Sequence, residues 1–286
     1  MKYYFTFFII VFIGSCQMKS SDLEELFDFP EDLNEVSGIT YSDDSKILWA
    51  LQDRGNSNEI YGFKLDGSHE KSLTIANATN RDWEDITTSA SGDIYIGDFG
   101  NNANERKDLC IYKVEQSELQ NNVAYSAYKI EFSYPEQTEF PPSKEERYYD
   151  VEGFFEFQEH FYLFTKNRSK NFDGTTFVYQ IPNLSGVHKA QLVGTFKTCT
   201  NYNRCAVTSV ALSPKKDKIA ILTRSKLILF QDFTADNFLE GKRRDIDLNH
   251  FSQKEGVVFK DQHTILIADE RNKRSGGKLY QYRLND

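Results

Sequence analysis

The chain has little of several things that would place it in a familiar class of protein. Its 34 Lys and Arg against 43 Asp and Glu give a formal net charge of −9. Because no basic stripe runs along it, nucleic acid is excluded as an expected partner. Only 16 Gly and 6 Pro occur among 286 residues, too few for a collagen-like or low-complexity chain. With 39% hydrophobic and 14% aromatic residues, the chain can build a core, so wholesale disorder is excluded too.

Short motifs that identify an enzyme class are also missing. The sequence contains no Gly-x-Ser-x-Gly nucleophile elbow, no Gly-x-x-x-x-Gly-Lys phosphate loop, no His-Glu-x-x-His motif and no dinucleotide fingerprint. It also lacks the Cys and His spacing that is typical of a zinc site. Whether the protein is an enzyme is therefore left open by its motifs.

The first sixteen residues have the features of a targeting segment. Lys2 precedes an apolar run over residues 3–13, and Gly, Ser and Cys follow at 14–16. The run is too short to span a bilayer with any margin and is typical of a secretory signal. Its last four residues resemble the bacterial lipoprotein signal, in which the Cys thiol is acylated. We therefore expect a signal peptide at residues 1–15 and lipidation of Cys16; a plain signal peptide with an incidental Cys is the alternative.

A lipid anchor predicts a protein of the bacterial cell envelope. Several acyl chains on Cys16 would hold the chain stably at a membrane, with residues 16–22 as a tether and residues 23–286 as the folded domain. Gln17 follows the Cys, where Asp would resemble an inner-membrane retention signal. We therefore expect an outer-membrane lipoprotein that faces the periplasm or the cell surface.

Three cysteines remain beyond the predicted anchor, and two of them are close in sequence. Outside the cytoplasm a disulfide is permitted, and Cys199 and Cys205 are near enough to close a short loop. We expect a disulfide between them, with Cys110 left over in a buried strand. Two unpaired thiols are the alternative.

Three short elements recur in the same order five times along the chain. The first is an acid or small residue, then Gly, Asp or Ser, then an apolar residue, at 37–39, 84–86, 152–154, 208–210 and 255–257. An apolar run of strand type follows each time, at 47–50, 94–97, 162–165, 220–223 and 266–268. The third element centres on an aromatic residue, namely Tyr61, Tyr112, Tyr179, Phe230 and Tyr280.

This repeat of about fifty residues predicts a β-propeller. Each unit supplies three strands and usually a fourth, expected at 71–76, 125–134, 189–197 and 244–248. The fifth unit has no fourth strand, and residues 23–29 precede the first unit without a partner. Pairing the two would close the ring and remove an open edge. The sequence thus predicts an all-β propeller of five four-stranded blades, closed by an N-terminal strand; six blades and a β-sandwich are the alternatives.

The repeat also resembles a known family. Segments 82–86, 95–102, 111–114 and 255–257 read Asp-Trp-Glu-Asp-Ile, Tyr-Ile-Gly-Asp-Phe-Gly-Asn-Asn, Ile-Tyr-Lys-Val and Glu-Gly-Val. They resemble the SdiA-regulated and esterase-like-phytase group of secreted propellers, from about Glu35 onwards. The resemblance implies the propeller fold. Some members of that group are described as calcium-binding or phosphoesterase-like, which the resemblance implies for this chain as an expectation.

Polar residues of the repeat are expected to converge at one mouth of the central channel. The first two strands of a blade are antiparallel, so the start of the first and the end of the second lie on one face. The starts carry Glu35, Glu84, Asp85, Glu152, Thr208 and Glu255. The ends of the second strands carry Asp53, Asp98, Lys166, Arg224, Asp269 and Glu270.

Two interpretations of this ring compete. The carboxylates can tie turns, because Asp and Gly at 53–56 and 98–101 are typical of tight turns. Crowded like charges are costly without a counter-ion, however, which favours a Ca²⁺ or Mg²⁺ site. In that interpretation the metal ligands are Glu84, Asp98, Glu152 and Glu255. A polar or anionic ligand would then be held by Lys166, Arg224, Asp53 and Asp269.

The function expected from the sequence is binding at this mouth. The lipid-anchored propeller would bind a small-molecule or protein ligand, with a divalent cation as the candidate cofactor. One alternative is a metal-dependent hydrolase of phosphoesters or lactones that uses the same ring. A second alternative is a structural subunit of an envelope complex. Because a fold does not determine a function, all three hypotheses stay open at this point.

Overall fold

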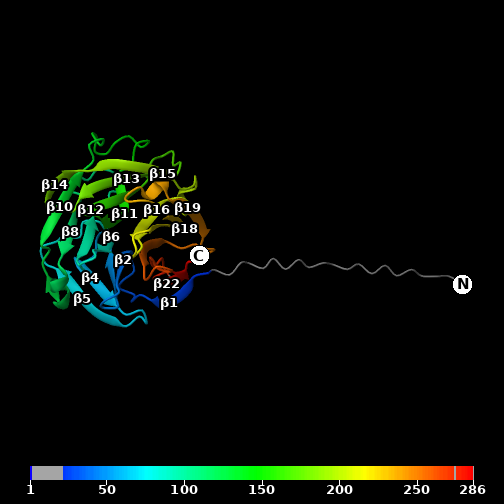
Figure 1. Cartoon of the computed structure of the whole chain (residues 1–286), viewed down its shortest axis with the longest axis horizontal. Coiled ribbons are helices and arrows are strands. Elements are labelled where there is room, and N and C mark those ends of the chain that lie inside the picture. The colour runs from blue at the N-terminus through cyan, green and yellow to red at the C-terminus, as the bar shows by residue number, and fades with distance from the viewer. Residues whose placement is uncertain (2–21, 274, 286) are drawn as a thin grey trace.

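The computed structural model describes Met1, residues 22–273 and residues 275–285. Its strands form five sheets arranged as blades around one central axis (Figure 1). The five-bladed propeller predicted from the sequence is confirmed, and the six-bladed and β-sandwich alternatives are wrong. The expected signal peptide apart from Met1, the predicted lipidation site Cys16 and nearly all of the tether lie outside the described residues. Within the part of the chain that is described, no helix is both long enough and apolar enough to cross a bilayer.

Each blade is built from strands that follow one another from the channel outwards. Blade 1 contains β2 (Val36–Ser42), β3 (Ile47–Gln52), β4 (Glu59–Phe63), β5 (His69–Ile75) and β9 (Val123–Ala124). Blade 2 contains β6 (Trp83–Thr88), β7 (Ile94–Asp98), β8 (Cys110–Val114), β10 (Tyr128–Ser133) and β14 (Gly186–Lys189). Blade 3 contains β11 (Asp150–Phe157), β12 (His160–Lys166), β13 (Thr175–Pro182) and β15 (Gln191–Lys197).

The last two blades complete the ring, the fifth with help from the N-terminal strand. Blade 4 contains β16 (Val207–Leu212), β17 (Lys218–Thr223), β18 (Lys226–Gln231) and β19 (Lys242–Asp247). Blade 5 contains β20 (Lys254–Phe259), β21 (Thr264–Asp269), β22 (Lys278–Arg283) and β1 (Glu24–Asp28). Strand β1 pairs antiparallel with β22, so the predicted closure is confirmed; the blue and red strands lie side by side in Figure 1.

Two short strands connect neighbouring blades at the rim. The sequence predicts one strand over 125–134, but Val123 and Ala124 form β9, which pairs in parallel with β5 of blade 1 before β10 begins in blade 2. The expected strand over 189–197 is likewise preceded by β14, which pairs in parallel with β10 of blade 2. The chain therefore stays hydrogen-bonded to one blade while it moves to the next, which ties adjacent blades together.

The hydrophobic core lies between blades rather than inside one sheet pair. Five clusters of buried side chains each combine residues from two neighbouring blades. Between blades 1 and 2, for example, Trp49 packs in one cluster with Trp83 and Ile96. The second strand of each blade is buried on both faces, so it is a continuous apolar run, whereas outer strands such as β15 and β19 are mostly exposed. The five interfaces hold the innermost strands firmly around the channel.

Candidate functional site

Every innermost strand carries a β-bulge at the same position of the repeat. The register of the first and second strands shifts by one residue in all five blades. The extra residues, which have no partner across the strand, are Ser37, Glu84, Glu152, Thr208 and Glu255. A bulge re-aims its side chain and ends regular pairing. The first repeated sequence element is therefore a bulge motif, and it places three glutamates in one ring at the predicted mouth.

The residue after each bulge forms the waist of the channel. A Cβ on Gly38 would lie 2.7 Å from the Cα of Asp85, so these neighbouring strands approach too closely for a side chain. Asp85 occupies the space beside Gly38. Its carboxylate accepts hydrogen bonds there from Phe154 N at 3.1 Å and Ile86 N at 2.9 Å. Burial raises the pKa of Asp85 well above its usual value. Asp85 thus has a structural role that joins blades 2 and 3.

Three carboxylates meet above this waist. One oxygen from each of Glu84, Asp150 and Glu152 lies within 4.8 Å of the other two. Two oxygens that bind the same Ca²⁺ at about 2.4 Å can be at most about 4.8 Å apart, so the triad meets this distance requirement for one such ion. Glu84 comes from the bulge of blade 2, whereas Asp150 and Glu152 come from the start of β11 in blade 3. This group is called the acidic triad below.

Two cations lie against the acidic triad. Lys166 Nζ is 2.8 Å from Glu152 Oε2, and both side chains are almost completely buried. The Arg168 guanidinium spans both acids of blade 3, with Nε 2.5 Å from Asp150 Oδ2 and Nη2 2.8 Å from Glu152 Oε1. Its Nη1 donates to the Tyr202 hydroxyl at 2.6 Å. Asp150 and Glu152 are therefore neutralised in part, while no described residue donates a hydrogen bond to the Glu84 carboxylate.

Burial and crowding favour the protonated forms of two acids of the triad, Glu84 and Glu152. Burial raises the pKa of Glu152 to about 8, even though Lys166 and Arg168 act in the opposite direction. Burial, followed by the charge of Glu152, raises the pKa of Glu84 well above its usual value. Burial opposes the charge on Lys166, but the neighbouring Glu152 raises its pKa. If all three acids of the triad were ionised, their three negative charges would therefore exceed the two positive charges of Lys166 and Arg168.

Further acids extend this negative region across the mouth. Burial, with the charge of Glu35, raises the pKa of Asp53 to about 7. Burial, with the charge of Glu255, raises the pKa of Glu270 to about 8. Burial, with the charge of Asp150, raises the pKa of Asp82 to about 6. These shifts show that carboxylates from blades 1, 2, 3 and 5 influence one another, as expected if they share one mouth.

The structure separates the residues that the sequence assigned to metal binding. Glu84 and Glu152 belong to the acidic triad, and Glu255 occupies the equivalent bulge of blade 5. Asp98 instead accepts hydrogen bonds from Arg106 Nη2 at 2.9 Å and from Asp82 N at 3.1 Å. Its carboxylate therefore ties the loop after β7, which is the turn-forming interpretation for this one residue.

The four residues assigned to ligand binding also divide into two groups. Lys166 lies against the triad, and the carboxyl group of Asp53 belongs to the same acidic mouth. Arg224 and Asp269 instead line a separate pocket between blades 4 and 5. Asp269 accepts hydrogen bonds there from Lys278 N at 2.9 Å and the Tyr280 hydroxyl at 3.1 Å.

Asp150 and Arg168 are the residues of this site that the sequence analysis did not select. Each lies two positions from a residue that it did select, Glu152 or Lys166. Arg168 lies beyond the end of β12 and Glu152 is a bulge residue, so strand alternation does not relate these pairs, and nearness in sequence was the only available signal. Asp150 is the first residue of β11 and pairs with Lys166.

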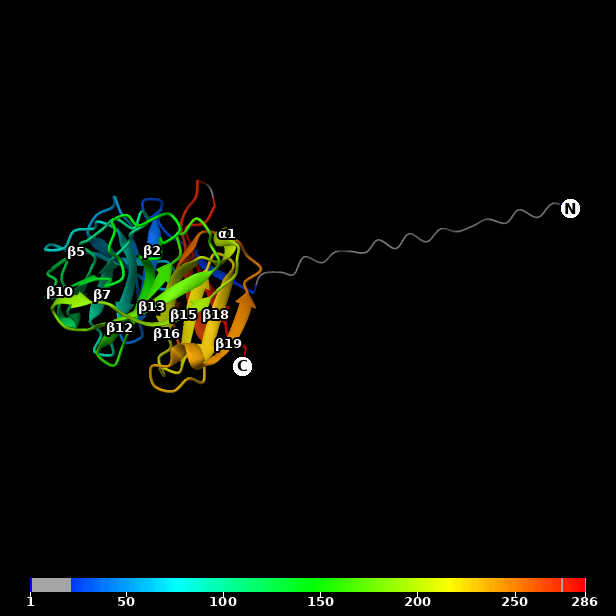
Figure 2. The same cartoon turned by 90° about the horizontal axis from the view of Figure 1, so that it is seen from above.

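A disulfide-closed loop adjoins the triad. The Sγ atoms of Cys199 and Cys205 are bonded, and the loop between them contains the short helix α1 (Tyr202–Cys205). This loop carries Tyr202, which holds Arg168. Figure 2 shows α1 on the same side of the propeller as the connection between β21 and β22. The third cysteine, Cys110, is buried and unpaired in β8, where burial raises its pKa to about 12.

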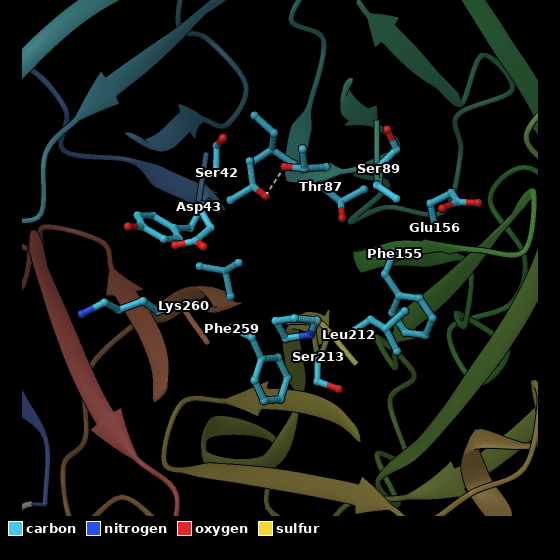
Figure 3. A pocket seen from close by; sticks show the side chains of 18 of the residues that line it. Ser42, Asp43, Thr87, Ser89, Phe155, Glu156, Leu212, Ser213, Phe259 and Lys260 are labelled. Atoms are coloured by element: carbon cyan, nitrogen blue, oxygen red, sulfur yellow. Dashed lines mark hydrogen bonds between the residues drawn. The ribbon is translucent and has the colours of Figure 1, made fainter. Parts of the chain in front are cut away.

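The opposite end of the channel has a different chemistry. A pocket of about 360 Å³ lies there among the far ends of the innermost strands. Figure 3 shows that all five blades contribute to it, with Ser42, Thr87 and Ser89 on one side and the rings of Phe155 and Phe259 on the other. The Thr40 and Thr88 hydroxyls are 2.6 Å apart across two blades. Asp43, Asp44 and Glu156 line this pocket together with Lys216 and Lys260, but among the described residues only the acids of the triad lie close enough together to share a metal ion.

Comparisons with known proteins support the fold and do not assign a family. No protein-family model matches the chain, and no curated protein matches its sequence. The resemblance to the SdiA-regulated and esterase-like-phytase group therefore stays a prediction, although the propeller that it implies is present.

Solved structures of similar fold are distant in sequence. The chain is similar to the PQQ-bound form of aldose sugar dehydrogenase from Streptomyces coelicolor, with 8% identity and a TM-score of 0.52 over 91% of this chain and 96% of that one. A gluconolactonase from Xanthomonas campestris has 9% identity and a TM-score of 0.46 over 87% and 72% of the two chains. Hydrazine synthase from Kuenenia stuttgartiensis has 11% identity and a TM-score of 0.40 over 82% of this chain, which spans 64% of that one. At these identities the similarity shows the fold alone.

Proposed function

We propose that the protein is a binding propeller whose acidic mouth holds a divalent cation, Ca²⁺ or Mg²⁺, and binds a polar ligand through it. The observation that carries this proposal is the acidic triad, in which one oxygen from each of Glu84, Asp150 and Glu152 lies within 4.8 Å of the others. Carboxylate oxygens at this spacing suit a hard cation. Lipidation of Cys16 and display from the cell envelope are part of the proposal.

The charge balance of the mouth favours a bound cation. Lys166 and Arg168 pair with Glu152 and Asp150, but Glu84 has no such partner among the described residues. Burial, followed by the charge of Glu152, raises the pKa of Glu84, so in the absence of a cation this carboxyl group holds its proton more tightly. A divalent cation would replace that proton and satisfy the same carboxylates.

A second polar group in the bulge ring supports the same location. Thr208, at the bulge of blade 4, has a buried Oγ1 without a hydrogen-bond partner among the described residues. A buried polar atom of this kind is unusual in a native protein. A cation with its remaining water ligands, or the polar ligand itself, would supply the missing partner.

Calorimetric titration of the purified, chelator-treated protein with Ca²⁺ and with Mg²⁺ tests the proposal. We expect saturable binding to the wild type and its loss in Glu84→Gln, which keeps the shape of the side chain and removes the charge. Because Glu84 holds no ion pair in the described structure, this variant should fold normally. Glu156→Gln, at the other end of β11, is the matched control and should bind like the wild type. Absence of saturable heat in the wild type, or equal binding in both variants, would contradict the proposal.

A further inference from the structure

A second pocket lies on the same face as the acidic mouth, between blades 4 and 5. Its volume is about 690 Å³, within the range of sites for small organic molecules. Arg224, which follows β17, lines one side of it. His250 and Ser252, which precede β20, and Tyr280 of β22 line other parts. Glu270 also lines it, and the electrostatic influence of Glu255 and Asp53 on Glu270 links the pocket to the mouth.

The acids of this pocket already have partners. Asp269 accepts hydrogen bonds from Lys278 N and the Tyr280 hydroxyl. Glu25 is 2.5 Å from Lys278 Nζ, and Glu270 accepts a hydrogen bond from Gln253. Each of these carboxylates therefore already has a hydrogen-bond or ion-pair partner and does not need a cationic ligand to supply one.

Arg224 stands in contrast to these acids. It is half-buried, and its guanidinium makes no hydrogen bond or ion pair with any described residue. Its backbone carbonyl is fixed by Lys254, whose buried Nζ is 3.2 Å from that oxygen. This contact fixes the main chain at Arg224 and leaves its side chain free to meet a ligand. A half-buried guanidinium without a counter-ion among the described residues attracts an anion.

Neutral hydrogen-bond donors complete the surroundings of Arg224. Lys254 Nζ is 3.0 Å from His250 Nδ1, and because an ammonium only donates, this nitrogen accepts and the ring proton is on Nε2. Burial and the charge of Lys254 lower the pKa of His250, so the ring is neutral at pH 7. The exposed Phe251 ring lies beside these groups and offers apolar surface.

We propose that this pocket binds the carboxylate or phosphate group of a small organic anion, with Arg224 as the charged contact. The planar guanidinium matches either oxyanion with two parallel hydrogen bonds. His250 and Ser252 add donors beside it, and Phe251 covers the apolar part of the ligand. The anion pocket, defined by Arg224, His250, Ser252, Glu270 and Tyr280, is separate from the acidic triad. The proposal goes beyond the cation site and does not depend on it.

Titration of chelator-treated protein with inorganic phosphate and with succinate tests this proposal, because chelation removes any cation from the mouth. We expect saturable binding of at least one of the two anions, and the preferred anion distinguishes a phosphate ligand from a carboxylate ligand. Arg224→Gln should weaken that binding at least about tenfold, the minimum expected from losing one charge-assisted contact. Its melting temperature should not change, because the Arg224 side chain holds no other residue.

Two further variants separate this proposal from the cation site. Arg283→Gln removes the same charge from the exposed far end of blade 5 and should bind the anion like the wild type. Glu84→Gln should lose cation binding and keep anion binding. Failure of both anions to bind, equal binding by Arg224→Gln and the wild type, or loss of anion binding in Glu84→Gln would each overturn the proposal.

Discussion

Phe29 directly follows the N-terminal strand β1 and packs between blade 5 and blade 1. Replacing it with a smaller residue therefore tests directly whether β1 closes the ring. Its side chain is 1% exposed, and its ring centroid lies 5.1 Å from Phe27 and 5.6 Å from Phe63 of blade 1. Its backbone nitrogen donates to Gly277 O at 2.8 Å. Burying a Phe in such surroundings is worth about 3–5 kcal/mol relative to Ala. At about 2–4 °C for each kcal/mol in a domain of this size, Phe29→Ala should lower the melting temperature by roughly 10 °C.

Urea denaturation followed by tryptophan fluorescence measures the loss. Leu184→Ala is the control, because Leu184 is 64% exposed and its truncation should change the free energy of unfolding by no more than about 0.5 kcal/mol. If Phe29→Ala and Leu184→Ala unfold at the same urea concentration, the N-terminal strand does not close the ring in solution. An unchanged melting temperature after removal of residues 23–29 would lead to the same conclusion.

Three other predictions concern the mouth, the disulfide and the anchor. Because burial raises the pKa values of Glu152 and Glu270 to about 8, the folded protein keeps protons that the unfolded chain loses, and the free energy of unfolding should fall as the pH rises from about 4 to about 8. Ca²⁺ should offset this fall. Denaturation curves at both ends of that pH range, with and without Ca²⁺, measure the effect, and a free energy of unfolding that does not change with pH would contradict the reasoning. Replacing both Cys199 and Cys205 by Ser should lower the free energy of unfolding by about 2 kcal/mol, because the disulfide closes only a short loop; an unchanged urea midpoint would contradict this. Cys16→Ala should release the protein from membranes or block its processing, whereas unaltered membrane fractionation would refute lipidation.

The blade repeat could be predicted from the sequence because its signals are local. A short apolar run and a turn are formed by residues that are neighbours in the chain, so five recurrences identify five blades. The strands β9 and β14 escaped prediction because they pair with the preceding blade. Such pairing depends on where the rim of that blade lies in space, and nothing in Val123 or Ala124 themselves indicates it.

The gathering of carboxylates at one mouth could be predicted from the sequence, but the contacts of each carboxylate could not. The bulge aligns Glu84 and Glu152 with Glu255, and a repeat pattern finds all three. The partner of each carboxylate, in contrast, depends on loops that follow no repeat. Arg106, in the loop after β7, forms a hydrogen bond with Asp98. Arg168, which follows β12, forms a salt bridge with Asp150. Side-chain competition of this kind is decided by distances that a sequence pattern does not contain.

The shared bulge gives the propeller five interchangeable slots. A residue without a cross-strand partner does not contribute to the pairing of its sheet, so its identity can change while the backbone of the blade stays the same. Three slots now hold glutamate, and the other two hold Ser37 and Thr208. Substitutions at these positions could raise or lower the number of negative charges in the ring one at a time. The same scaffold could therefore acquire a new preference for ions or ligands without rebuilding its core.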